Sequence, residues 1–223
     1  MRIDIKDKVL SKNDIVANRL RERFAKSGTF VINLASSPGS GKTTLLEKLL
    51  PRLKDSFKLA VVEGDLRTEN DANRLRQVGV NAVQIQTGDA CHLEAAQVES
   101  LLEGINADEL DILIIENIGN LVCPASYDLG EDLFFIMLST AEGDDKPAKY
   151  PTIFFNADYF ILNKIDLAPY VDFDIDRCVR YATDINAELK IFKTSARTEE
   201  GLDALADEIA RLATEKRATL ILR

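Results

Sequence analysis

The chain has 223 residues, 46% hydrophobic and 29% charged, which is typical of one large α/β domain or two small ones and excludes disordered and fibrous classes. The net charge of −9 repels phosphates and anionic lipids, so we expect no nucleic-acid partner. No apolar run approaches the roughly 18 residues of a membrane-spanning helix, and the start MRIDIKDK is too charged for a signal peptide. We therefore expect a cytoplasmic protein with no membrane partner.

The apolar pattern alternates between helical and strand periodicities. Ser11 and Asp14 resemble a capping box, which predicts an amphipathic helix that begins there and ends by Gly28. Short apolar runs predict buried strands at residues 30–34, 59–62, 82–85, 112–115, 133–138, 159–162 and 189–192. Amphipathic helices are predicted at residues 44–53, 69–78, 91–102, 174–187 and 202–213. This alternation predicts an α/β fold with a doubly wound, mostly parallel sheet flanked by helices.

A phosphate-binding loop follows the first predicted strand, in the sequence SSPGSGKTT from Ser36 onward. Small residues let backbone N–H groups close around a phosphate at a helix N-terminus, while lysine offers an ammonium and threonine can ligate Mg²⁺. Ser36 stands where the usual motif has glycine, so its backbone must avoid a glycine-only conformation. The alternative is an unrelated glycine-rich turn. The predicted nucleotide-binding residues here are Gly39, Ser40, Gly41, Lys42, Thr43 and Thr44.

Acidic residues end two further predicted strands. Asp65 follows LAVVEG and Glu116 follows DILII, with Gly119 three residues later. Either carboxylate could hold Mg²⁺ or orient the attacking water, and the Gly119 N–H could contact a γ-phosphate. Helix capping is the alternative for each carboxylate. We expect Thr43, Asp65 and Glu116 at Mg²⁺, with Lys42, Asp65 and Glu116 as the catalytic residues; which carboxylate positions the water stays open.

The sequence NKID at residues 163–166 indicates guanine recognition. The Asp166 carboxylate can accept from guanine N1–H and the exocyclic amine, whereas adenine presents an acceptor there. Asn163 can bond the base or tie the loop to the P-loop, and the Lys164 stem can lie over the purine. Ser195 and Ala196, in TSA at residues 194–196, offer backbone N–H groups to guanine O6. We therefore predict a single P-loop GTPase domain over residues 1–223, with residues 1–28 as an N-terminal helical extension.

Two cysteines and the single histidine form a second candidate site. Cys91 and His92 are adjacent at the start of a predicted helix, whose dipole favours thiolate, and Cys123 follows Glu116 and Gly119. Thiolate and imidazole suit Zn²⁺ or Ni²⁺, and three ligands leave the shell incomplete. Burial as ordinary core residues is the alternative, and it is our expectation for Cys178.

The segments TGDACHLEA, ENIGNLVCPA, SSPGSGKTT, EGDLRTENDA and NKID together resemble the HypB family of nickel-inserting GTPases of [NiFe]-hydrogenase maturation, more closely than the related UreG proteins. The resemblance spans nearly the whole chain. It implies a GTP-dependent homodimer that carries Ni²⁺ or Zn²⁺ on Cys91, His92 and Cys123. It also implies a HypA-type metallochaperone partner and the [NiFe]-hydrogenase large subunit as recipient. The N-terminal cysteine motif and the histidine-rich tract of some members are absent from this sequence, so we expect no metal storage.

These expectations combine into one hypothesis. GTP and Mg²⁺ order residues 116–123, so that the state of the γ-phosphate changes metal affinity. One alternative is a metal-independent G-protein switch that recruits a partner protein. Another is a P-loop small-molecule kinase, for which NKID has no use. The segment 142–151, EGDDKPAKYP, is the most loop-like, and we expect an ordinary solvated loop there. The alternative is that Lys146 or Lys149 lies at a dimer interface near the nucleotide.

Overall fold

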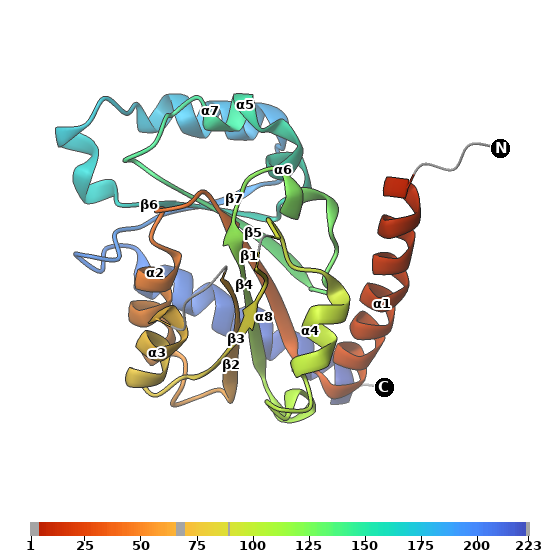
Figure 1. The fold of residues 1–223 in the computed structure, drawn as a ribbon. Coiled ribbons are helices and arrows are strands. Elements are labelled where there is room, and N and C mark those ends of the chain that lie inside the picture. Colours follow the sequence, from red (N-terminus) through yellow and green to blue (C-terminus); the bar gives the residue numbers. More distant parts are fainter. Residues whose placement is uncertain (1–4, 66–69, 89, 222–223) are drawn as a thin grey trace.

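The fold is that of a computed structural model, which describes residues 5–65, 70–88 and 90–221, with side chains between residues 12 and 220. Seven strands form one sheet in which every pairing is parallel, in the order β3-β2-β4-β1-β5-β6-β7 (Figure 1). The strands are β1 (Phe30–Ser36), β2 (Leu59–Asp65), β3 (Asn81–Gln86), β4 (Ile112–Gly119), β5 (Leu133–Ser139), β6 (Tyr159–Asn163) and β7 (Lys190–Lys193). All seven predicted strands, and the doubly wound α/β class, are confirmed.

Helices cover both faces of this sheet. The α-helices are α1 (Ile5–Ser27), α2 (Lys42–Leu49), α3 (Asn70–Gln77), α4 (Ala95–Leu101), α5 (Lys146–Lys149), α6 (Pro151–Asn156), α7 (Ile175–Ile185) and α8 (Leu202–Ile221). Short 3₁₀ turns lie at Leu50–Arg52, Ala107–Glu109, Cys123–Ser126 and Ile165–Tyr170. Within the described part of the chain, no helix is both long enough and apolar enough to cross a membrane.

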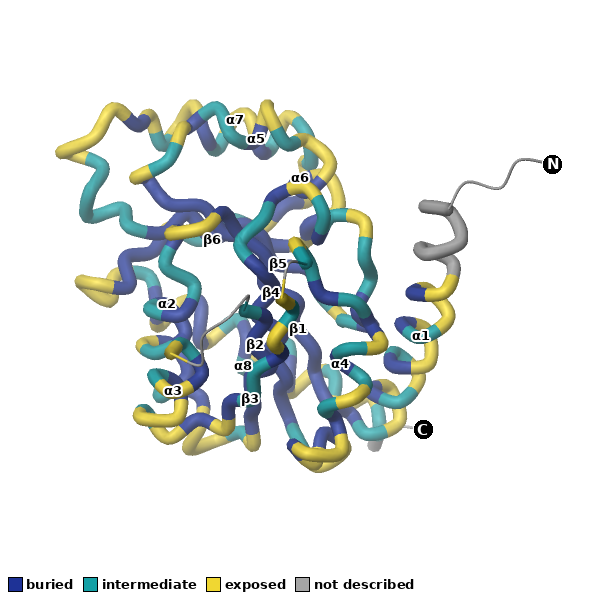
Figure 2. The backbone as a smooth tube through the Cα atoms, in the orientation of Figure 1, coloured by how far each residue is buried: buried dark blue, intermediate teal, exposed yellow. Residues whose placement is uncertain are grey.

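The two faces follow from the alternation of side chains along each strand. On β1, Ile32 and Leu34 pack in one core cluster with α2, α3 and α8. Val31 packs with α1 and α4, and Ala35 with α6 and α7, on the opposite face. The sheet is therefore buried on both sides, as Figure 2 shows by its dark interior and exposed outer helix faces. Cys178 of α7 lies in this core, where burial raises the pKa of its thiol to about 12, as its predicted packing role requires.

Several predicted helix boundaries are wrong. α1 begins at Ile5, so Ser11 lies inside the helix instead of at its start, because residues 5–10 contain no glycine or proline that would stop the helix. α4 begins at Ala95, which leaves Cys91 and His92 in the loop before the helix instead of in its first turn. The segment 142–151 contains α5 and the start of α6 instead of being a plain loop.

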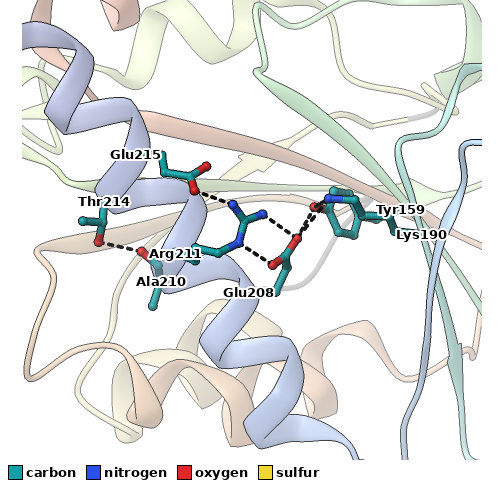
Figure 3. Close-up of polar contacts among 7 residues, drawn as sticks. All are labelled: Tyr159, Lys190, Glu208, Ala210, Arg211, Thr214 and Glu215. Carbon is teal, nitrogen blue, oxygen red and sulfur yellow. Dashed lines mark hydrogen bonds and ion pairs between the residues drawn. The ribbon is translucent and has the colours of Figure 1, made fainter.

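α8 extends eight residues beyond its predicted end at residue 213, to Ile221. Figure 3 shows how the middle of this helix is held to the sheet: Glu208 accepts hydrogen bonds from Tyr159 of β6 (2.5 Å) and Lys190 of β7 (3.3 Å) while it pairs with Arg211 (2.8 Å). These donors lower the pKa of Glu208 to about 2. The extension is anchored further on, where Lys216 donates to the backbone carbonyl of Thr29. These contacts fix the last helix across the strands that carry the base-recognition residues.

α1 is packed onto the domain beside α4, as the right side of Figure 1 shows. Its Leu20 and Phe24 are buried in the same cluster as Val98 of α4. The loop before β5 approaches α1 so closely that a Cβ on Gly130 would lie 2.7 Å from the Leu20 Cβ and 2.8 Å from the Ala17 carbonyl oxygen. Gly130 also has φ +80°, a left-handed conformation that favours glycine.

We expect Gly130→Ala to lower the free energy of unfolding by about 2–5 kcal/mol, the sum of left-handed strain and overpacking against α1. Gly88→Ala is the matched control, because Gly88 is also left-handed (φ +62°) but has open space around its Cβ position. That control should lose only the strain, about 1–2 kcal/mol. Chemical denaturation measures both. Equal losses in the two variants would contradict the close packing of α1.

Candidate nucleotide and metal site

The candidate site lies at the carboxyl ends of the central strands. β1 pairs with β4 on one side and β5 on the other, so the loop after β1 opens into the crevice between them. Ser36 at the end of β1 is in register with Gly119 at the end of β4. The P-loop and the end of β4 therefore meet at one edge of the sheet (Figure 1), although Ser36 and Gly119 are 83 residues apart in the sequence.

The P-loop is organised around the hydroxyl of Ser36. This oxygen accepts hydrogen bonds from the Lys42 ammonium (2.7 Å) and from the Ser40 hydroxyl (2.8 Å). Ser36 keeps the extended backbone of β1, so the loop avoids the glycine-only conformation at this position, as predicted. Gly39 and Gly41 take left-handed φ values of +76° and +93°. Burial lowers the pKa of Lys42, which shows that its ammonium sits in a site short of solvent.

Glu116 faces the P-loop from β4. Its side chain accepts from the Thr43 hydroxyl (3.1 Å), and its other oxygen, Oε2, is buried without a hydrogen-bond partner among the described residues. Burial raises the pKa of Glu116 to about 7. A threonine hydroxyl beside an unpartnered buried carboxylate oxygen is a donor set that suits Mg²⁺.

Glu63 is a second buried carboxylate in this place, and the sequence reasoning missed it. It lies on β2 in register with Glu116 of β4. Burial, with the charge of Glu116 as the next cause, raises the pKa of Glu63 to about 8. A bound cation would stabilise the ionised forms of these two neighbouring carboxylates. Strand alternation could have identified Glu63 from the sequence, because it lies two residues before Asp65 in LAVVEGD and therefore points to the same face of the strand.

The other predicted residues of the phosphate end lie near these groups. Asp65 ends β2, half-buried, and its charge contributes to the raised pKa of Glu63. The Thr44 hydroxyl accepts from Arg74 (3.0 Å), which also pairs with Glu47 (2.6 Å). The acidic side chains therefore gather on the β2 and β4 side of the P-loop.

Lys146 is a further residue of this place, which the sequence analysis considered and left out of the predicted site. Its ammonium lies 3.1 Å from the Ser37 hydroxyl of the P-loop and 3.1 Å from a carboxylate oxygen of Glu142. The expectation of a solvated lysine is wrong here, because β5 lies beside β1 and its carboxyl end delivers α5 to the phosphate loop. Lys149, by contrast, is exposed and pairs with Asp145.

The residues of NKID hold the loop after β6 to the P-loop. Asn163 donates to the Ser40 carbonyl (3.1 Å), and the Lys164 ammonium donates to the Gly39 carbonyl (2.6 Å). Lys164 has φ +59°, an uncommon conformation for lysine that this contact helps to maintain. Of the two roles considered for Asn163, the structure shows the tie to the P-loop.

The TSA segment is joined to the same loop. The Ser195 hydroxyl donates to Asp166 (2.7 Å), while the N–H groups of Ser195 and Ala196 donate to the Glu200 carbonyl (3.0 Å) and to Asn163 Oδ1 (3.1 Å). Both predicted O6 donors therefore have partners within the chain. Beside them is a pocket of about 390 Å³. Its lining residues are Gly39, Gly41, Thr44, Asn163, Lys164, Asp166, Leu167, Ala196 and Arg197.

The predicted metal residues are brought together beyond the end of β4. The Cys91 Sγ lies 2.8 Å from the Cys123 Sγ and 3.5 Å from the His92 Nδ1, and one ligand atom of each residue lies within 4.8 Å of the others. Cys91 is exposed. Burial lowers the pKa of His92, whose ring packs on Tyr127 with centroids 3.7 Å apart, so the neutral imidazole that metals bind is favoured.

Comparisons with known proteins agree with this geometry. The family model "CobW/HypB/UreG, nucleotide-binding domain" matches residues 30–193. The hydrogenase maturation factor HypB of Escherichia coli is 49% identical over 201 residues, which cover 90% of this chain and 69% of that protein. The hydrogenase/urease maturation factor HypB of Helicobacter pylori is 48% identical over 205 residues, covering 90% and 84%.

Solved structures give the same relationship. The crystal structure of Helicobacter pylori HypB in complex with nickel superposes with a TM-score of 0.85 at 47% identity, covering 92% of this chain and 96% of that one. HypB from Archaeoglobus fulgidus gives a TM-score of 0.86 at 35% identity, covering 91% and 99%. The chain therefore belongs to the HypB family of hydrogenase maturation factors, within the CobW/HypB/UreG nucleotide-binding proteins.

Proposed function

We propose that this protein is a GTP-hydrolysing metallochaperone that binds Ni²⁺ through Cys91, His92 and Cys123 and assists its insertion into [NiFe]-hydrogenase. The observation that carries the proposal is the course of β4. Glu116 of this strand contacts the P-loop residue Thr43, and Cys123 follows Gly119 by only four residues. A single short segment therefore joins the phosphate end of the nucleotide site to the cluster of metal ligands.

The residues at the phosphate end of the site have different roles in GTP hydrolysis. Backbone N–H groups of residues 39–44 cradle the phosphates, and the Lys42 ammonium moves from the Ser36 hydroxyl to the β- and γ-phosphate oxygens. Thr43, Asp65 and Glu116 would hold Mg²⁺, which neutralises charge on the phosphates during transfer. Glu63 lies beside Glu116 and keeps this end of the sheet acidic. Asp65 or Glu116 would also orient the attacking water.

The base is held at the other end of the P-loop. Asp166 lines the 390 Å³ pocket and accepts from Ser195, so its carboxylate is fixed before the base arrives. One oxygen pairs with guanine N1–H and the other with the exocyclic amine, whereas adenine would leave the carboxylate facing an acceptor. The Ala196 N–H reaches guanine O6 only by leaving Asn163.

Ni²⁺ is cargo in this proposal. Two thiolates and an imidazole suit Ni²⁺ or Zn²⁺, and the nickel complex of the Helicobacter pylori protein favours nickel. Three protein ligands leave the shell incomplete, so a second copy of the chain related by a twofold axis would complete it. A HypA-type metallochaperone supplies or receives the ion, and the hydrogenase large subunit is its destination.

The proposal predicts that Ni²⁺ affinity depends on the nucleotide. Competition titration on reduced protein should give dissociation constants that differ by at least about 5-fold between GDP and a non-hydrolysable GTP analogue, because residues 116–123 touch both ligands. Cys123→Ala should weaken Ni²⁺ binding in both states and leave slow GTP hydrolysis, while Cys178→Ser in the core should not alter Ni²⁺ affinity. Equal affinities in the two nucleotide states would contradict coupled metal handling.

Base recognition is tested by Asp166→Asn. GTP affinity should fall about 10-fold or more, because two hydrogen bonds to a charged acceptor are lost. XTP binding should improve, since xanthine carries a carbonyl in place of the amine and the asparagine amide can donate to it. Ser195→Ala is the control, because it removes the contact to Asp166 and leaves the carboxylate. Unchanged selectivity in equilibrium binding of the two nucleotides would rule out guanine recognition by Asp166.

The contact between β4 and the P-loop is tested at Gly119. An added Cβ would lie 3.0 Å from the Cα and 3.1 Å from the nitrogen of Pro38, both backbone atoms that cannot rotate away. Gly119→Ala should therefore weaken binding of the GTP analogue by about 5-fold or more, and that of GDP by less. Gly104→Ala is the control, as its nearest contact is at 3.5 Å. Equal affinities for wild type and Gly119→Ala would contradict the role of this contact.

A further inference from the structure

A chain of buried amide side chains connects β1 and β4 to the loop before α4 that carries Cys91 and His92, which we call the metal loop. Asn117 lies on β4 next to Glu116 and has no solvent exposure (0%). Its Oδ1 accepts from the backbone N–H of Leu93 (3.2 Å) and of Ile118 (3.0 Å). Its Nδ2 donates to Asn33 Oδ1 (3.2 Å) on β1, the strand that leads into the P-loop. The Asn117 side chain of β4 is therefore bonded both to β1 and to Leu93, the residue that follows the candidate metal ligand His92.

The metal loop is held on both sides of His92. Asn117 binds the N–H of Leu93, directly after His92, and Asn120 donates to the carbonyl of Cys91 (3.1 Å), directly before it. Leu93 is itself fully buried in the core. The loop therefore has little freedom to move independently of β4 and the segment after it.

A second asparagine provides an internal comparison. Asn13 of α1 accepts from the N–H of Ala95 (2.9 Å) and donates to the Asp128 carbonyl (2.8 Å). It holds the same loop as Asn117, two residues later, and is also buried. However, it comes from the N-terminal helix, which carries none of the predicted nucleotide residues. Asn13 anchors the loop, whereas Asn117 anchors it to the strand that faces the phosphates.

We propose that Asn117 is a positioning residue that transmits a displacement of the end of β4 to the metal ligand His92. This inference rests on the proposed function, since it names the residue through which nucleotide state reaches the metal. Breaking the bond from Leu93 would leave its buried backbone N–H without an acceptor, so the loop follows β4 when the end of that strand moves. Asn33 fixes the other side of the amide and sets its orientation.

The first test measures hydrogen exchange of individual amides in the metal-free wild-type chain, with GDP and with a non-hydrolysable GTP analogue. The Leu93 amide should exchange at rates that differ by at least about 5-fold between the two states, because its acceptor moves with β4. The Ala95 amide, held by Asn13, should differ less. Identical Leu93 exchange in both states overturns the inference.

The second test compares two alanine variants by Ni²⁺ titration with each nucleotide. In Asn117→Ala the ratio of the two dissociation constants should fall below about 2-fold, whereas Asn13→Ala should keep the wild-type ratio even if its Ni²⁺ affinity falls. A purely structural role of Asn117 would lower affinity and leave the ratio unchanged, which overturns the inference. If Asn117→Ala does not fold, the exchange measurement on the wild type decides the question.

The two proposals fail differently. Nucleotide-dependent Leu93 exchange with identical Ni²⁺ affinities would reject nucleotide-gated nickel handling and retain the positioning role of Asn117 on the loop. Nucleotide-dependent Ni²⁺ affinity with unchanged Leu93 exchange would retain the proposed function and reject Asn117 as its route.

Discussion

The central constraint on this protein is that β4 lies between β1 and β2 in a fully parallel sheet. Its carboxyl end therefore reaches the P-loop, where a Cβ on Gly119 would press on the backbone of Pro38, and the chain then continues directly to Cys123. Because both faces of the sheet are covered by helices, the strand is fixed along most of its length. The end of the strand is where the P-loop and the candidate metal ligands come together, and the proposed coupling depends on movement at that end.

Polar groups buried at this edge serve different purposes on its two sides. Toward the phosphates, Glu63 and Glu116 are carboxylates whose pKa values are raised by burial, a state that a cation would stabilise in its ionised form. Toward the metal loop, Asn33 and Asn117 are neutral amides that satisfy one another and the backbone. In the proposed mechanism the carboxylates bind the cation and the amides transmit movement, since a satisfied buried hydrogen bond is costly to break.

The features that the sequence predicted well are local ones. The P-loop, NKID and the seven strands follow from short patterns whose chemistry does not depend on the rest of the chain. The grouping of Cys91, His92 and Cys123 was expected from the resemblance to the HypB family. The residues that the sequence analysis missed or left out depend on register and neighbourhood. Glu63 becomes notable only when β2 pairs with β4, Lys146 only when β5 lies beside β1, and Asn117 only when the loop folds over β4. The start of α4 was misplaced because side chains from other elements hold the N–H groups of residues 93 and 95, so the loop stays extended until Ala95.

The central claim is that the nucleotide and metal sites are thermodynamically coupled, and coupling must be reciprocal. The most direct test is therefore the affinity of the reduced protein for GDP and for a non-hydrolysable GTP analogue, measured in the presence of Mg²⁺ with and without saturating Ni²⁺. The account predicts that Ni²⁺ changes the preference between the two nucleotides by at least about 5-fold, the same factor by which the nucleotides change Ni²⁺ affinity. A preference that is identical with and without Ni²⁺ would contradict it and leave two independent sites on one fold.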